Sequence, residues 1–366
     1  MIEGFYPVCE PHLTRRKLLT LAMVAGIAPG FTAEVSPTPY RDQGVRQFIE
    51  RYAMTPDDPW SLVHAIRGVG RGCSINGESA AAYVLRTCVR AQAVQQRRYL
   101  YIPTSIEVHS NMFLKTFLEA GVPLSEKLSL DGHVFQLRDL GEGAKALFRF
   151  DPHTFDRNDL AWSLIAFAEL QAQAWDNAYG QRIDLTEVAG FGLQVLQDAT
   201  QELQPYGAAQ IPLPKKLAIH GYTCGGTHLA YSVLVAARRG FLPAAGTDIL
   251  QAQLRMLVYR LQADPDLIDR HYQAIPTAPA VDIFRVGAKL KIVGHILECL
   301  GYAQTHGLWQ PSPGERTHIE QAMQEVQGLL SYVLTLDFAA IRQRHAQLAQ
   351  QVIGDTCHAF RGLHLV

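Results

Sequence analysis

The sequence has almost no excess of charge of either sign. Lys and Arg total 33, Asp and Glu total 34, and the formal net charge is −1 over 366 residues. Proteins that bind nucleic acid or an anionic membrane surface through their charge carry a basic excess. The balance therefore argues against both partners, and a small molecule or a glycan is the predicted substrate. The oligomeric state is left open.

Cysteine is scarce, and no two cysteines stand in a CxxC pair. The six cysteines are Cys9, Cys73, Cys88, Cys224, Cys299 and Cys357. So few cysteines in so long a chain exclude a disulfide-dense scaffold. If Cys9 leaves with an N-terminal signal, five remain, and this odd number predicts at least one thiol that is free or serves as a ligand.

Apolar runs long enough to span a membrane are absent, but a short one lies near the N-terminus. Arg15 and Arg16 precede the run LAMVAGIA, which ends at Pro29. A spanning helix needs about 20 apolar residues, so no stable membrane span is predicted. Paired arginines before such a run resemble a twin-arginine export signal. The resemblance implies export in the folded state, and we expect residues 1–35 to be the signal and the protein to be periplasmic or secreted. An amphipathic or buried first helix is the alternative.

Strand patterns are few, and helical spacing of apolar residues dominates the rest of the chain. The runs 98–102 and 133–137 are the clearest strand candidates. Apolar residues recur three and four positions apart in 79–93, 110–120, 159–173, 185–204, 226–238, 246–263, 282–306, 315–335 and 337–353. The pattern predicts one all-α domain over residues 36–366.

Apolar and amphipathic helices alternate along this domain. The apolar segment 226–238 precedes the amphipathic segment 246–263, and 282–304 precedes 315–335 in the same way. A helix that is apolar all round is buried, and an amphipathic one covers it. The succession resembles the (α/α) toroid architecture of terpene cyclases, lanthionine cyclases and many glycan lyases and hydrolases. An irregular helical bundle or a solenoid is the alternative.

The stretch HGYTCGGTH carries the chemistry that the sequence shows most clearly. His220, Cys224 and His228 are evenly spaced, but eight helical residues rise about 12 Å, too far for two ligands of one ion. The glycines at 225 and 226 break the helix. With that break the three side chains are predicted to converge on zinc or copper.

The pentapeptide from Cys224 to His228 is similar to the metal-binding CGGTH of alanyl-tRNA synthetase editing domains. That resemblance covers five residues, lacks the upstream HxxxH, and implies only that Cys224 and His228 can be ligands. The alternative is a glycine-rich turn with a buried cysteine and a capping Thr227.

A second soft pair, His295 and Cys299, stands one helical turn apart on segment 282–306. If that helix begins at the pocket end of the domain, His295 lies ~20 Å below it, at ~1.5 Å per residue. The pair is therefore predicted to be buried in the centre of the domain and separate from the first cluster.

Four further residues are candidates for the catalytic site. Glu107 and His109 stand near the start of a predicted inner helix, where either can carry a proton. Arg285 and Lys289 are expected to bind an anionic group of the substrate. Asp264 and Asp266, on either side of Pro265, are either caps of a turn or a paired acid and base.

These observations predict an exported, metal-dependent hydrolase or lyase. A metal-free glycan lyase or hydrolase, with a cleft lined by Trp162, Trp175 and Tyr179, is one alternative. A non-catalytic scaffold of the cell envelope is the other.

Overall fold

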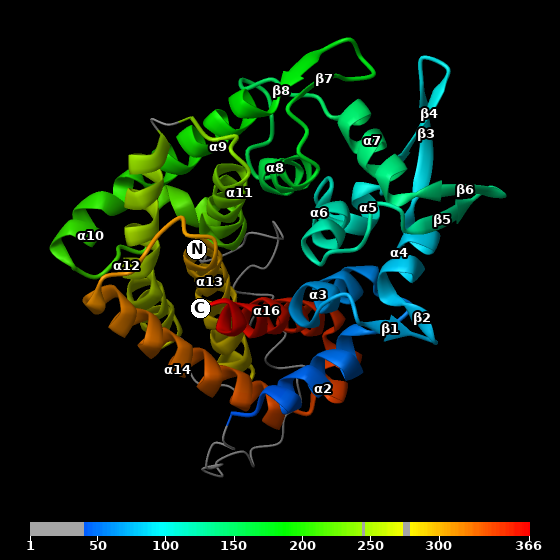
Figure 1. Cartoon of the computed structure of the whole chain (residues 1–366). Helices are drawn as coiled ribbons and strands as arrows, with labels where there is room; N and C mark the ends of the chain where they lie inside the picture. The colour runs from blue at the N-terminus through cyan, green and yellow to red at the C-terminus, as the bar shows by residue number, and fades with distance from the viewer. Residues whose placement is uncertain (1–39, 244–245, 274–278) are drawn as a thin grey trace. The chain divides into compact units, whose positions relative to one another are not determined.

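The computed structural model describes residues 40–243, 246–273 and 279–366. The predicted export signal at 1–35 lies outside these residues. Helices make up most of the described chain, and its strands form only two-stranded antiparallel hairpins (Figure 1). The all-α prediction is confirmed, whereas the toroid arrangement stays a prediction. Within the described ranges, no helix combines the length and the apolar character that crossing a membrane requires.

The chain divides into two compact units. The C-terminal unit comprises the residues up to Phe48, Gln197–Thr227 and Gln251–Val366, and the N-terminal unit comprises Ile49–Leu196 and His228–Leu250. Four helices have residues in both units: α2 (Asp42–Ala53), α9 (Leu185–Thr200), α11 (Thr227–Arg238) and α12 (Gly246–Gln273).

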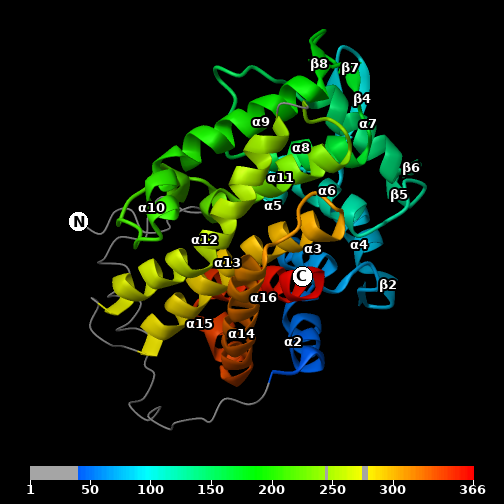
Figure 2. The same ribbon diagram turned by 60° about the vertical axis from the view of Figure 1, so that its left-hand side comes forward.

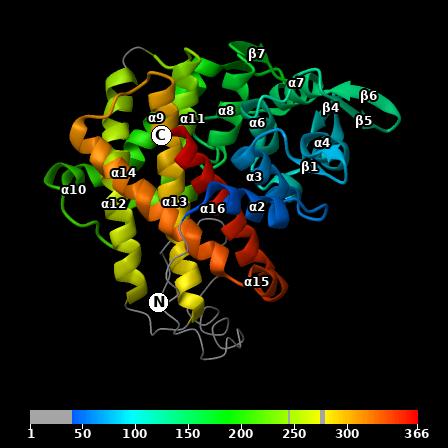
Figure 3. The same ribbon diagram turned by 60° about the horizontal axis from the view of Figure 1, so that its bottom comes forward.

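The C-terminal unit is built on the pairing of two long helices. Its other helices are α10 (Gln204–Ala209), α13 (Pro279–Thr305), α14 (Pro313–Thr335), α15 (Phe338–Arg344) and α16 (Ala346–Leu365). Helices α13 and α16 lie side by side (Figures 2 and 3). Their close approach requires glycine, because a Cβ on Gly294 would lie 2.7 Å from Cα of Ala359, and one on Gly362 would lie 2.8 Å from the carbonyl oxygen of Gly294.

Two helix boundaries in this unit differ from the sequence prediction. Helix α12 continues through Pro265 to Gln273, where a turn was predicted. Proline removes one helical hydrogen bond, but the neighbouring Asp264 is completely buried among polar partners that lie inside the unit. The predicted helix 337–353 is instead two helices, because His345 (φ −142°, ψ 63°) leaves the helical region.

The N-terminal unit combines short helices with four hairpins. Its helices are α3 (Pro59–Val69), α4 (Ala80–Cys88), α5 (Thr104–Glu107), α6 (Met112–Glu119), α7 (Leu137–Leu147) and α8 (Leu160–Glu169). The hairpins pair β1 (Ser74–Ile75) with β2 (Glu78–Ser79), β3 (Arg90–Val94) with β4 (Arg97–Tyr101), β5 (Lys127–Leu130) with β6 (His133–Gln136), and β7 (Ala174–Asp176) with β8 (Arg182–Asp184).

The two strand candidates in this unit are confirmed as β4 and β6. The helix predicted over 79–93 is shorter, because α4 ends at Cys88 and β3 begins at Arg90. Strand β4 packs against α7, and β5 packs against α4 (Figure 1).

The glycine at the α13–α16 crossing supplies a test of this packing. We expect Gly294→Ala to lower the free energy of unfolding by about 1–3 kcal/mol, because the new methyl group overlaps the backbone of α16. Gly328→Ala on α14 is the matched control: nothing lies within 4 Å of its Cβ position, so it should be neutral or stabilise the helix by up to about 1 kcal/mol. Urea unfolding of both variants measures the difference, and equal stabilities would contradict the close approach.

Candidate functional site

The HGYTCGGTH stretch forms two short 3₁₀ turns followed by a helix. The turns are Ala218–Gly221 and Thr223–Gly226, and α11 begins at Thr227. Cys224, Gly225 and Gly226 have φ angles of 50°, 61° and 76°. These left-handed values interrupt the helix at the glycine pair, where the sequence predicted the break.

Position 226 requires glycine for a second reason besides its backbone angle. A Cβ at this position would lie 2.3 Å from Cδ1 of the fully buried Ile219. After the turn, the Thr227 hydroxyl donates a hydrogen bond of 2.8 Å to the carbonyl oxygen of Cys224. The turn is therefore held from both sides, and Cys224 is held directly before the start of α11.

A buried arginine on α12 fixes the same turn. Arg260 Nη1 donates to the carbonyl oxygen of Gly225 at 2.9 Å, and its Nε donates to Asp264 at 2.8 Å. The other carboxylate oxygen of Asp264 lies 3.3 Å from Nε2 of His220. Burial alone would raise the pKa of Asp264, but the Arg260 guanidinium and the His220 imidazole hold it below its usual value.

His220 thus lies against Asp264, and a different histidine lies with Cys224 and His228. The candidate ligand atoms of Cys224, His228 and His295 all lie within 4.8 Å of one another. The boundary between the two units falls between Thr227 and His228, inside the first turn of α11. His228 is the second residue of α11 and follows Cys224 by four positions in the chain.

The prediction that His295 lies far from this cluster was wrong. It assumed that the cysteine turn stands level with the start of α13, but the turn lies beside His295, in the C-terminal half of that helix. The Cys299 thiol, one helical turn after His295, lies 3.4 Å from the carbonyl oxygen of Thr227. Where two segments cross is a tertiary property, and axial rise along one helix cannot supply it.

The hydrogen bonds of His295 determine which ring nitrogen can bind a metal. Its Nδ1 lies 2.6 Å from the carbonyl oxygen of Lys291. A carbonyl can only accept, so Nδ1 carries the proton and Nε2 carries the lone pair. The ring of His358 stacks on His295 at 3.8 Å, and its own Nδ1 lies 2.7 Å from Glu298. Metal-binding histidines usually donate their other ring N–H to a carbonyl or carboxylate group, as His295 does to Lys291.

None of the cysteines in the described part of the chain forms a disulfide. Cys224 is only 9% exposed and His295 only 3% exposed. The thiol is therefore available as a ligand at a site that bulk solvent reaches poorly.

The predicted proton carriers Glu107 and His109 lie in the N-terminal unit and have separate partners. Glu107 accepts backbone N–H groups of Asn111 (2.8 Å) and Phe113 (3.0 Å) at the start of α6. Burial raises its pKa to about 8, although the two backbone hydrogen bonds oppose the shift. His109 instead lies 2.7 Å from Asp159, with its ring stacked on Trp162 at 3.7 Å.

The predicted anion-binding residues Arg285 and Lys289 are paired with carboxylates of the C-terminal unit. Lys289 Nζ lies 2.6 Å from Asp269 and 2.8 Å from Glu325, and Arg285 lies 3.7 Å from Asp269. The ion pairs offset both charges, so neither side chain presents an unmatched cation to a substrate.

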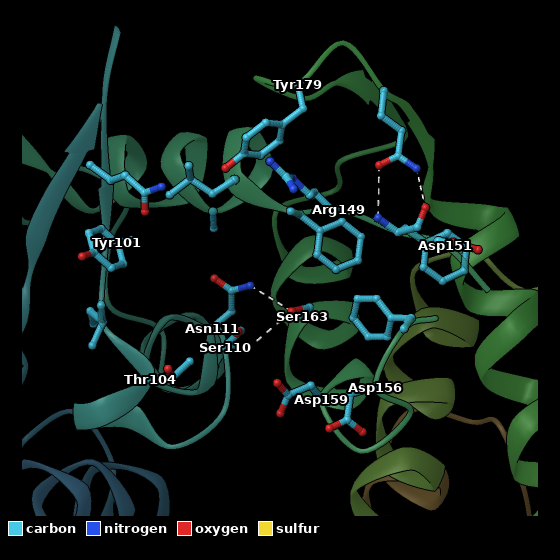
Figure 4. A pocket seen from close by; sticks show the side chains of 18 of the residues that line it. Tyr101, Thr104, Ser110, Asn111, Arg149, Asp151, Asp156, Asp159, Ser163 and Tyr179 are labelled. Atoms are coloured by element: carbon cyan, nitrogen blue, oxygen red, sulfur yellow. Dashed lines mark hydrogen bonds between the residues drawn. The ribbon is translucent and has the colours of Figure 1, made fainter. Parts of the chain in front are cut away.

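A pocket of about 710 Å³ lies in the N-terminal unit (Figure 4). Of the four predicted catalytic residues, Glu107 lines it. Of the three aromatic residues expected to line a cleft, only Tyr179 does so; Trp162 is buried, and Trp175 donates to the carbonyl oxygen of Lys145. Much of the pocket comes from the loop 148–156, whose sequence FRFDPHTFD alternates aromatic and charged residues. A loop has no periodicity, so composition was the only sequence signal.

Comparison of the chain with models of protein families, with curated proteins and with solved structures found no match.

Glu107 predicts a pH dependence of stability. Its folded pKa of about 8 exceeds the usual 4.5, so the folded state holds the proton more tightly than the unfolded state. The resulting stabilisation is complete below pH 4.5 and is lost as the pH rises towards 8, at up to about 1.4 kcal/mol per pH unit. Asp355, whose pKa burial raises to about 7, adds a slope of the same sign.

We expect Glu107→Gln to remove the contribution of Glu107 to the pH dependence of the unfolding free energy. The contribution of Asp355 should remain. Urea unfolding at pH 5, 6, 7 and 8 measures both slopes. Glu142→Gln, at an exposed position on α7, is the control and should follow the wild type. Parallel curves for wild type and Glu107→Gln would show that Glu107 is ionised in the folded protein.

Proposed function

We propose that the protein is an exported, metal-dependent enzyme of the hydrolase or lyase type, with zinc or copper held by Cys224, His228 and His295. The observation that carries the proposal is the approach of these three ligand atoms to within 4.8 Å of one another. The export part of the proposal is supported by the sequence alone, through Arg15 and Arg16 before the short apolar run.

The donor set agrees with a borderline or soft metal. One thiolate and two imidazoles suit zinc and copper, whereas magnesium and calcium prefer oxygen ligands. His295 presents the nitrogen with the lone pair, because Lys291 occupies the other one. Cys224 is held in a turn that Gly226, Thr227 and Arg260 brace.

Three protein ligands leave a tetrahedral ion one position for water or substrate, which distinguishes a catalytic site from a closed structural one. A bound ion would supply Lewis acidity and a water whose pKa is lowered to about 7. His220 has a different part, because its contact with Asp264 helps to hold the loop from which Cys224 projects.

His109 is the candidate proton carrier of the N-terminal unit. Asp159 orients its imidazole, and Trp162 stacks on one face of the ring. The ring of His228 lies 5.0 Å from that of Trp162. Trp162 thus contacts both His109 and the proposed ligand His228. A proton passing from His109 to a substrate would leave from Nε2, because Nδ1 faces Asp159.

Metal content tests the ligand set. Apo protein reconstituted with zinc and dialysed should retain about one ion per chain in the wild type. Cys224→Ser and His295→Gln should each weaken retention by at least about a hundredfold, because loss even of a residue that orients a ligand costs 10–100-fold. Inductively coupled plasma mass spectrometry provides the stoichiometry.

Two matched variants serve as controls. His220→Gln removes a buried histidine of the same loop, and Cys88→Ser removes a buried cysteine of the N-terminal unit. Cys88→Ser should bind zinc as the wild type does, and His220→Gln, which keeps all three proposed ligands, should retain more zinc than either ligand variant. A wild type without stoichiometric zinc or copper would refute the proposal, and loss of metal in His220→Gln with retention in His295→Gln would restore the set predicted from the sequence.

A further inference from the structure

The charged lining of the pocket in the N-terminal unit consists of the guanidinium of Arg149 and the carboxyl groups of Glu107, Asp151, Asp156 and Asp159. Arg149 and Tyr179 lie together at one end, and Asp156 and Asp159 lie at the other, with Asn111 and Ser163 between them (Figure 4). All its lining residues belong to the N-terminal unit. At about 710 Å³ it lies within the usual range for a small-molecule site, about 300–1,000 Å³.

The basic end presents a guanidinium that no protein carboxylate neutralises. The Arg149 guanidinium carbon lies 3.4 Å from the centroid of the Tyr179 ring, and no carboxylate within the described part of the chain forms an ion pair with it. Stacking on Tyr179 uses the flat face of the guanidinium, so the N–H groups at its edge can still donate hydrogen bonds to a ligand. Those groups match the two oxygens of a carboxylate.

The acidic end presents two carboxylates, and neither forms an ion pair with a Lys or Arg of the described residues. Asp156 accepts the backbone N–H of Asn158 at 2.9 Å, and Asp159 accepts a hydrogen bond from His109 at 2.7 Å. Each of these bonds uses one oxygen. The second oxygens and the combined negative charge suit an ammonium group.

One wall of the pocket is aromatic and preformed. Phe150 lies 5.8 Å from Phe155, centroid to centroid, and both line the pocket. The buried Asn177 donates to the carbonyl oxygen of Phe148 at 2.8 Å, and Gln181 accepts the backbone N–H of Phe150 at 3.1 Å. The β7–β8 turn thus fixes the aromatic loop before any ligand binds, which reduces the entropy cost of binding.

From this arrangement we infer that the pocket binds a short peptide with free termini, its carboxylate on Arg149 and its ammonium group on Asp156 and Asp159. The inference rests on the N-terminal unit alone and is independent of the proposed metal centre. The cavity is too large for a single small amino acid, and the phenylalanines offer contact area for apolar side chains. A neutral saccharide would leave both charged ends without partners, and a simple cation or anion would satisfy only one.

Calorimetric titration with the dipeptide Leu-Phe tests the inference. We expect wild-type protein to bind Leu-Phe about tenfold or more tightly than N-acetyl-Leu-Phe or Leu-Phe amide, because each blocked form loses one charge-assisted contact. Maltotriose, a neutral ligand of comparable size, should not bind. Repeating the titration in Cys224→Ser keeps the result separate from any metal.

Two variants assign each terminus to its end of the pocket. Arg149→Met should weaken Leu-Phe binding about tenfold and remove the preference over the amide, while the preference over the acetylated form persists. The double variant Asp156→Asn/Asp159→Asn should show the reverse pattern. Arg157→Met and Asp176→Asn, exposed positions outside the lining, are the matched controls and should bind as the wild type does.

Three results would overturn the inference. They are the absence of Leu-Phe binding at millimolar concentration by folded protein, equal affinity for the free and blocked dipeptides, and binding of maltotriose in preference to Leu-Phe. Thermal unfolding of each variant shows whether a loss of binding reflects a loss of fold.

Discussion

The buried guanidinium of Arg260 connects helix α12 to the cysteine turn in the C-terminal unit. Arg260 is 1% exposed, and it joins the carboxylate of Asp264 on its own helix to the carbonyl oxygen of Gly225 in the cysteine turn. Removing one partner of such a pair would leave the other charge buried without compensation, which costs far more than a surface ion pair. The position of Cys224 relative to α12 therefore depends on this arginine.

The same interaction explains why α12 passes through its proline. Asp264, Pro265 and Asp266 are typical of a turn when the sequence is considered alone. In the structure, however, Asp264 must face Arg260 one helical turn earlier and His220 in the loop. These contacts are compatible with a continuous helix, and they outweigh the hydrogen bond that Pro265 cannot donate.

The N-terminal unit uses a different means of positioning side chains. Its pocket is lined mostly from loops and short strands, and polar side chains brace them: Asn177 and Gln181 hold the aromatic loop, and Glu107 holds the start of α6. Such bracing allows charged and aromatic groups to project into the pocket without belonging to a helix face. The two proposed sites thus differ in construction, one set by helix crossing and the other by braced loops.

The sequence by itself determined the local features of this protein. Apolar spacing predicted the helices, alternation predicted β4 and β6, and Gly225 and Gly226 predicted the break before α11, because each of these depends on neighbouring residues and backbone sterics. Only the tertiary structure decided which histidine lies with Cys224 and His228, and that Glu107 and His109 have separate partners. His295 is 71 positions beyond Cys224 in the sequence, and it reaches the cluster because the cysteine turn packs against the C-terminal half of α13. A crossing point follows from the packing of whole helices, down to the glycines at the α13–α16 contact, and no local pattern encodes it.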